Sequence, residues 1–111
     1  MQIPVNKIRP AMAKQKLNDE SKLGFGVYMS NHMFKLDYTT EENWHNPRIE
    51  PYAPLALYPA AAILHYAQEA FEGLKAYRSK KNNILLFRPR ENIKRLSRTC
   101  KQLCIPAYPE E

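Results

Sequence analysis

The stretch of residues 65–78 joins two different periodicities without a turn dipeptide between them. Upstream, residues 60–66 are rich in alanine and predict a short helix, with Pro59 suited to the first helical position. Downstream, alternating side chains over residues 71–78 predict a strand. A glycine inside a strand usually marks a bulge or the close approach of a ligand or another backbone. The join therefore requires a specific local structure, with Gly73 as the candidate for close approach.

The size and composition of the chain predict a folded core. A chain of 111 residues is long enough for one domain that buries roughly two-thirds of its unfolded surface. Apolar residues make up 44% and aromatic residues 11%, which excludes a disordered or fibrous composition. The nine prolines are scattered, so many short elements joined by rigid turns are expected rather than a few long helices.

Charge and cysteine content limit the classes of partner and the compartment. The net charge of +6 favours an anionic partner, namely nucleic acid, anionic lipid or a phosphorylated ligand, and composition alone does not choose among them. No apolar run approaches the roughly 18 residues of a membrane span, and the amino terminus lacks the apolar segment of a signal peptide. Cys100 and Cys104 lie four residues apart on one expected helix, where disulfide geometry is poor, so both are predicted to be buried or half-buried hydrophobes in a reducing, cytoplasmic compartment.

The amino-terminal half predicts an arm followed by strands and a loop. Residues 1–22 are polar and without a period, which predicts an extended basic arm, with a partner subunit as one means of ordering it. Residues 23–38 alternate with one slip and predict a long strand, or a bent pair of strands with a bulge or turn at residues 30–31. Residues 39–54 carry loop-forming residues, and Trp44 is expected to pack on the sheet as a lid. Residues 55–58 predict a brief strand.

The carboxy-terminal third predicts a hairpin and a helix. Residues 79–83 form a polar turn between two alternating runs, which is typical of a β-hairpin. Pro89 begins a helix expected to last to about Leu103. An apolar stripe at spacings of three and four follows one face of this helix: Ile93, Leu96, Cys100, Leu103 and Cys104.

Basic side chains cluster at the start of this helix and along it. They are Arg88, Arg90, Lys94, Arg95, Arg98 and Lys101. The N–H groups and the dipole of a helix amino terminus favour an anion, so a phosphate site is one interpretation. A solvated basic face is equally consistent with the pattern, and a nucleic-acid surface is a third option that lacks a recognised fold signature.

Side chains around Gly73 suggest a pocket. Tyr66, Lys75 and Tyr77 could bring phenols and an ammonium to it, although tyrosines at the end of a strand more often pack in a core with the hydroxyl at the rim. The three histidines have no metal-ligand spacing with one another or with the cysteines, so no metal site is expected.

The order of these motifs closely resembles the amino-terminal domain of branched-chain amino-acid aminotransferases. The resemblance covers essentially everything from Leu23 onward. It is carried by His-Tyr at 65–66, Phe-Glu-Gly-Leu-Lys-Ala-Tyr-Arg at 71–78, Leu-Phe-Arg-Pro at 86–89, Asn-Ile-Lys-Arg-Leu at 92–96 and Leu-Cys-Ile-Pro at 103–106. Asn-His-Met-Phe at 31–34 and Trp-His-Asn-Pro-Arg-Ile at 44–49 fit the same family.

The resemblance implies a fold-type IV enzyme that uses pyridoxal phosphate to move the amino group of leucine, isoleucine or valine to 2-oxoglutarate. Residues 23–111 would then be part of an α+β amino-terminal small domain, with a mainly antiparallel sheet, flanking helices and no large domain. Family members are commonly homodimers whose partners are small amino and oxo acids rather than nucleic acid or a membrane. The alternative that stays open is a basic binding module for nucleic acid or a protein.

The resemblance also assigns site residues. Arg95 matches the arginine that grips the cofactor phosphate, and Tyr66 matches a tyrosine that helps to hold the substrate α-carboxylate. Phe71 and Gly73 match the pocket wall, and Lys75 is expected to order Tyr66 or a nearby carboxylate.

Two departures from the family pattern follow. Met29 stands where the family often has an aromatic residue, and its thioether would still form an apolar wall. The family's Schiff-base lysine and the carboxylate paired with the pyridinium nitrogen lie in the large domain, so no catalytic residue is expected in this chain and the chain alone is predicted to be inactive.

Overall fold

The computed structural model of the chain describes residues 2–107, which form two compact units that divide between Ala56 and Leu57. The first contains two short 3₁₀ helices and strands β1 (His32–Thr39) and β2 (Asn43–Pro51). The second contains α1 (Ala62–Tyr66), β3 (Ala76–Arg78), β4 (Ile84–Leu86) and α2 (Pro89–Gln102). Both pairs of strands are antiparallel, so the predicted α+β class with a mainly antiparallel sheet is confirmed.

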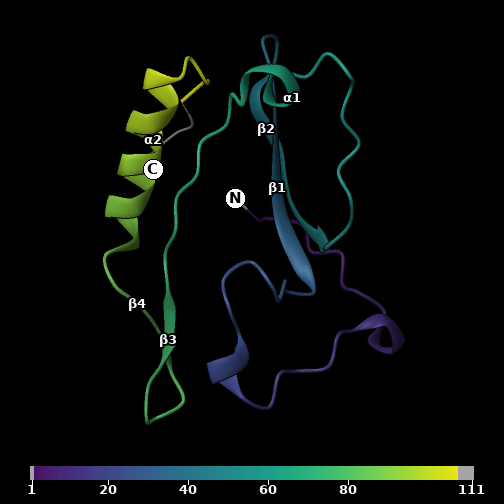
Figure 1. The fold of residues 1–111 in the computed structure, drawn as a ribbon, viewed down its shortest axis with the longest axis vertical. Coiled ribbons are helices and arrows are strands. Elements are labelled where there is room, and N and C mark those ends of the chain that lie inside the picture. The colour runs from purple at the N-terminus through teal and green to yellow at the C-terminus, as the bar shows by residue number, and fades with distance from the viewer. Residues whose placement is uncertain (1, 108–111) are drawn as a thin grey trace. The chain divides into compact units, whose positions relative to one another are not determined.

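Strands β1 and β2 form a twisted two-stranded ribbon (Figure 1). The prediction of a loop at residues 39–54 is therefore wrong. The prolines and asparagines that suggested a loop are accommodated by an irregularity: the register shifts between Lys35 and Asp37, and Asn46 on the facing strand has φ of 53°. A proline is tolerated here because a two-stranded ribbon has only edge strands.

Side chains across the ribbon reinforce its register. The rings of Tyr38 and Trp44 meet edge to face with centroids 5.2 Å apart, and Trp44 is half-buried. Trp44 belongs to strand β2 itself, so it is not a lid carried by a loop. Arg48 Nη1 donates to Asp37 Oδ2 at 2.7 Å and Arg48 Nη2 donates to Asp37 Oδ1 at 3.2 Å. This ion pair joins residues 11 positions apart in the sequence, on two different strands. The composition of residues 39–54 gives no sign of such a contact, so it predicted a loop.

The amino-terminal arm is ordered by its own chain. Val5 forms an isolated parallel bridge with Ile49 on β2. The Asn6 N–H donates to Ile49 O at 2.8 Å, and the Ile49 N–H donates to Pro4 O at 2.9 Å. The Ile8 N–H donates to His32 Nε2 at 3.0 Å. The backbone of residues 4–6 is thus held by β2, and two 3₁₀ helices, Pro10–Met12 and Glu20–Lys22, interrupt the rest of the arm.

Residues 23–31 do not form the predicted strand, which begins only at His32. Gly24 and Gly26 have φ of 62° and 69°, in the left-handed region that glycine adopts readily. These two residues turn the chain where the alternating side chains predicted extended backbone. The brief strand predicted at residues 55–58 is also absent, and Tyr58 there is 87% exposed.

The expected join between helix and extended chain is present in the second unit. Helix α1 ends at Tyr66 because Ala67 adopts the left-handed conformation, with φ of 48°. The helix begins at Ala62, so the prediction of Pro59 as its first residue is wrong; Pro59 O instead lies 2.6 Å from His65 Nε2. The predicted strand at 71–78 is shorter than expected, since only Ala76–Arg78 pairs with a neighbour, and Gly73 lies outside it.

The β3–β4 hairpin and helix α2 confirm the local predictions for the carboxy-terminal third. Tyr77 faces Leu85 in the hairpin, and α2 starts at Pro89. The buried face of α2 is centred on Ser97 and Cys100. Leu103 and Cys104 at the end of the predicted stripe are exposed, so the prediction of a buried or half-buried Cys104 is wrong. Cys104 has φ of 54° and lies beyond the helix, which removes it from the helical face.

The expected hydrophobic core is missing from the described residues. Among them, Cys100 is the one buried apolar residue, whereas Phe25, Phe87 and Tyr66 are 80–90% exposed. No helix among the described residues is long and apolar enough to cross a membrane. Backbone pairing and polar contacts, rather than a packed core, therefore hold each unit in its fold.

Deletion of residues 1–6 should accelerate hydrogen exchange at the Ile49 amide. The deletion removes both backbone hydrogen bonds between the arm and Ile49, each worth about 0.5–1.5 kcal/mol. Exchange measured by NMR would test this, with the Ser79 amide, bonded to Asn83 O in the other unit, as the unaffected control. Unchanged protection of Ile49 would show that the arm does not stabilise the ribbon.

Candidate functional site

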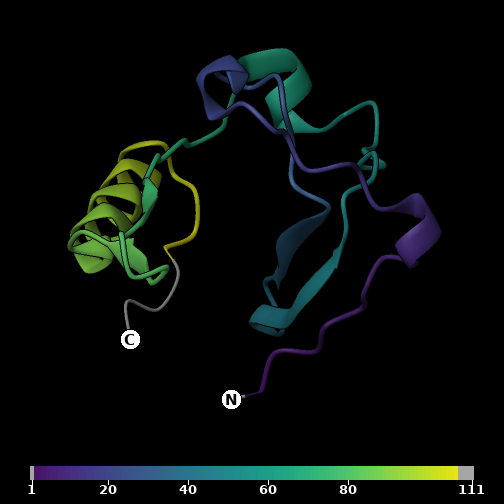
Figure 2. The same cartoon turned by 90° about the horizontal axis from the view of Figure 1, so that it is seen from below.

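The segment that follows α1 lies beside α2 in both views (Figures 1 and 2). Gln68 Nε2 donates to Leu103 O at the end of the helix at 2.8 Å, and Asn92 Nδ2 near its start donates to Gly73 O at 2.9 Å. Five residues of extended chain cover about 17 Å, as do eleven residues of α-helix. The segment is therefore stretched along the helix in the opposite direction, which brings Gly73 to the amino-terminal part of α2.

Glu72 is the centre of a hydrogen-bonded cluster at this end of the helix. Arg95 donates to it through two nitrogens, from Nε to Oε2 at 2.5 Å and from Nη2 to Oε1. Asn92 Nδ2 donates to Oε1 at 3.0 Å, and the Gly73 N–H donates to the same oxygen at 3.1 Å. The Glu72 side chain is only 6% exposed, so nearly all of its hydrogen-bonding capacity is met within the chain.

The electrostatics of the cluster keep both partners charged. Hydrogen bonding and the charge of Arg95 lower the pKa of Glu72 from its ordinary 4.5 to about 2, with smaller contributions from Asn92 and the Gly73 N–H. The same pair raises the pKa of Arg95. Bidentate contact between a guanidinium and a carboxylate is among the strongest charge-assisted arrangements in proteins. The ion pair is therefore present across the physiological range of pH.

Arg95 keeps one edge of its guanidinium available. A guanidinium has five N–H donors in a planar fork, and Glu72 takes the edge formed by Nε and Nη2. Nη1 takes no part in this contact with Glu72, and the Arg95 side chain is 62% exposed while that of Glu72 is 6% exposed. An oxyanion could accept from this second edge without displacing the carboxylate.

The structure brings together some of the residues that the sequence assigned to the site. Gly73 and Arg95 meet through Glu72, and Phe71 and Lys75 lie on the same extended segment. Tyr66 ends α1 and is 83% exposed, with its ring centroid 6.4 Å from that of His65. The roles assigned to these residues stay predictions. Across residues 2–107, no group of three His, Cys, Asp or Glu side chains could hold a metal ion.

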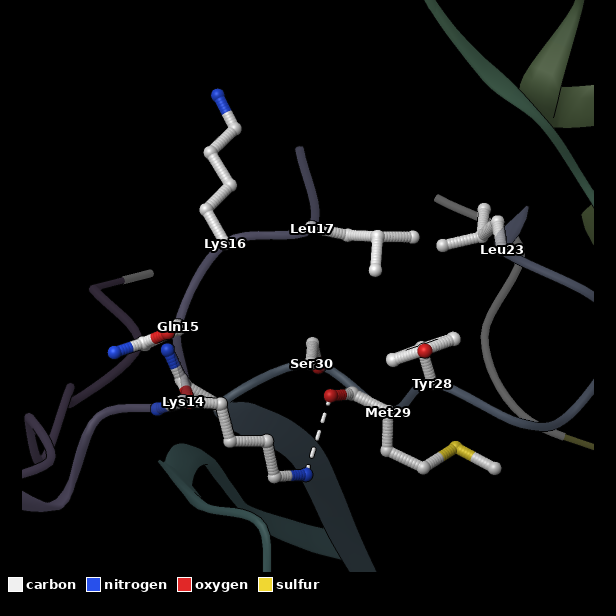
Figure 3. A pocket seen from close by; sticks show the side chains of 9 residues that line it. Lys14, Gln15, Lys16, Leu17, Leu23, Tyr28, Met29 and Ser30 are labelled. Carbon is white, nitrogen blue, oxygen red and sulfur yellow. Dashed lines mark hydrogen bonds between the residues drawn. The ribbon is translucent and has the colours of Figure 1, made fainter. Parts of the chain in front are cut away.

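Met29 belongs to the other unit, where it lines a separate pocket (Figure 3). The pocket has a volume of about 530 Å³ and lies between the arm and the turn before β1. Lys14 Nζ donates to Met29 O at 3.2 Å across one side of it and lies 4.8 Å from the centre of the Tyr52 ring. The arm thus bonds the backbone of Met29, and the role of its side chain as an apolar wall stays a prediction.

Known proteins resemble the chain over nearly its whole length. Branched-chain-amino-acid transaminase 1 of Bacillus subtilis is 53% identical over 93 residues, which cover 84% of this chain and 26% of the relative. Over these residues the chain is similar to branched-chain-amino-acid aminotransferases. Branched-chain-amino-acid aminotransferase 2 of the same organism is 44% identical over 105 residues, and the cytosolic enzyme of Saccharomyces cerevisiae is 42% identical over 106 residues. No model of a protein family matches the chain.

The chain spans about a quarter of the length of the aminotransferases that it matches. This confirms the expectation that it corresponds to a part of a longer enzyme. The relatives do not favour the alternative of a basic binding module.

Two members of this hydrogen-bonded cluster, Glu72 and Asn92, were not predicted from the sequence. Both lie in the motifs that carry the resemblance, but neither was given a role. The spacing of Asn92 and Arg95, three residues apart on a helix, places them on one face and could have suggested a shared partner. Nothing in the spacing identifies Glu72 as that partner, because it lies 23 residues before Arg95.

The Glu72 carboxyl should stay ionised far below the pH at which an ordinary glutamate is protonated. Because the pKa of Glu72 is lowered on folding, the stability that the ion pair contributes is fully present above pH 4.5 and is lost as the pH falls through about 2. A ¹³C NMR titration of the carboxyl groups would measure this, and the Arg95→Met variant should move the Glu72 titration back toward 4.5. Titration of Glu72 near 4.5 in the unaltered chain would contradict the ion pair in solution.

Proposed function

We propose that this chain is the amino-terminal part of a pyridoxal-phosphate-dependent aminotransferase that moves the amino group of leucine, isoleucine or valine to 2-oxoglutarate. The supporting observation is the 53% identity over 93 residues to an enzyme named as a branched-chain-amino-acid transaminase. We also propose that the complete enzyme is a homodimer in the cytoplasm, since the yeast relative is named as cytosolic.

The donor set around Arg95 fits the phosphate of such a cofactor. A phosphate monoester needs N–H donors and positive charge, and the Arg95 side chain, which is 62% exposed, supplies both. Bound pyridoxal phosphate would act as the electron sink that makes amino-group transfer possible. The task of this chain is then to hold the phosphate end of the cofactor through Arg95.

The segment between α1 and β3 would form the substrate side of the site. Tyr66 carries a phenol that can donate to an α-carboxylate, and Phe71 offers an apolar ring to a branched side chain. Lys75 would order Tyr66 or a nearby carboxylate. Chemistry at the amino group would depend on a lysine supplied by the remaining length of the enzyme, so the chain alone would not transaminate.

Gly73 supports the substrate-side assignment. A Cβ added there would lie 3.7 Å from the Phe71 ring, which is an ordinary contact, and the residue is not in the left-handed region. Nothing within the described chain therefore demands glycine at this position. A ligand or a further part of the enzyme approaching the backbone would explain it.

A chimeric enzyme would test the proposed function. The matching 93 residues of the Bacillus subtilis transaminase would be replaced by those of this chain, and formation of glutamate from leucine and 2-oxoglutarate would be followed. The chimera should be active, whereas the 111-residue chain alone should give no turnover. Circular dichroism and gel filtration would verify folding. A folded chimera without transamination, or turnover by the chain alone, would contradict the proposal.

The Gly73→Ala variant should separate folding from substrate binding. In the 111-residue chain it should leave the thermal midpoint unchanged or raise it slightly. Alanine reduces the conformational entropy of the unfolded state, which raises the free energy of unfolding by about 0.4–1 kcal/mol. In the chimera it should raise the KM for leucine. Gly26→Ala is the control: nothing lies within 4 Å of the added Cβ, but φ of 69° makes it destabilising by about 1–2 kcal/mol. An unchanged KM in the folded Gly73→Ala chimera would remove Gly73 from the site.

A further inference from the structure

We propose that Glu72 is a positioning residue for an oxyanion site: its carboxylate fixes the Arg95 guanidinium so that the free edge, which carries Nη1, faces a phosphate group. The identity of that phosphate as part of a pyridoxal cofactor rests on the proposed function. The positioning of Arg95 itself rests on the contacts of this chain alone.

The first step of the argument is how the guanidinium is held. Arg95 is a long side chain with several rotatable bonds, and ordering it to bind an anion costs entropy. Its Nε and Nη2 both donate to the nearly buried carboxylate of Glu72, which restricts the plane and the direction of the fork. The entropy is therefore lost on folding and not again on anion binding.

The second step is that Glu72 is itself immobile. Asn92 Nδ2 donates both to Glu72 Oε1 at 3.0 Å and to Gly73 O at 2.9 Å, so one amide group holds the carboxylate and the adjacent backbone together. The Gly73 N–H donates to the same oxygen at 3.1 Å. Asn92 and Arg95 lie on the same helix, so the carboxylate cannot swing away without breaking contacts to two positions on α2.

The third step concerns the sign of the effect. A carboxylate near an anion site repels the anion, so charge alone predicts that removal of the Glu72 charge would tighten phosphate binding. Positioning predicts the opposite, because a loosened Arg95 must be ordered again for each binding event. Since the low pKa of Glu72 keeps it ionised throughout the accessible pH range, both effects are present together and only a measurement of the sign separates them.

Phosphate binding by the 111-residue chain would test the proposal. Inorganic phosphate would be titrated while the Nε–H signal of Arg95 is followed by ¹⁵N NMR. The Glu72→Gln variant keeps the shape of the side chain and removes its charge. It should weaken phosphate binding about five- to tenfold and broaden the Arg95 signal.

The matched control is Glu91→Gln. Glu91 lies on the same helix and pairs with Lys94 at 3.4 Å, so the variant removes the same charge without touching Arg95. It should leave binding at Arg95 unchanged or slightly tighter. Asn92→Ala, which removes the amide that holds Glu72, should weaken binding to a smaller extent, and it provides the test if Glu72→Gln fails to fold.

Equal or tighter phosphate binding by the Glu72→Gln variant would overturn the proposal, as would a wild-type Arg95 signal that phosphate does not shift. Either result is distinct from failure of the proposed function, which the turnover of the chimera reports. Loss of binding in Glu72→Gln together with an inactive chimera would leave an oxyanion site and remove the aminotransferase. An active chimera, together with unaltered phosphate binding by the Glu72→Gln variant, would support the aminotransferase function and remove the positioning role of Glu72.

Discussion

The ion pair between Glu72 and Arg95 is the contact on which the second unit depends. Between α1 and β3 the chain forms no strand ladder, so its place along α2 depends on side chains, with Gln68 at one end and Glu72 and Asn92 at the other. A nearly buried carboxylate is costly unless all its lone pairs are satisfied, and here four donors meet it. The contact that fixes the backbone is thus also the one that orients the guanidinium.

The first unit is held by the same kind of long-range polar contact. The arm pairs with Ile49 on β2, and Arg48 joins the two strands through Asp37. Neither unit encloses a substantial apolar core among the described residues, and large aromatic rings remain exposed. The chain spans about a quarter of the length of the aminotransferases that it resembles.

Local patterns predicted the elements whose geometry is set locally. Helix α2 begins at Pro89 as expected, and the polar turn at residues 79–83 joins β3 to β4. Prediction failed where distant pairing outweighed local preference: Pro47 and Asn46 predicted a loop, yet they lie in β2 because β1 offers a partner and the irregular register accommodates them. The spacing of Cys104 fits the helical period, but the helix ends at Gln102, before this residue.

The sequence by itself predicted the antiparallel hairpin, the amphipathic helix and the resemblance to aminotransferases from which Arg95 was chosen, because each is encoded by neighbouring residues or by ordered motifs. The tertiary structure decided what Arg95 contacts and which edge of its guanidinium Glu72 takes. An ion pair between residues 23 positions apart depends on the path of the chain between them. Along that path an extended segment runs beside α2 in the opposite direction, from its end to its start, and no local pattern specifies this geometry.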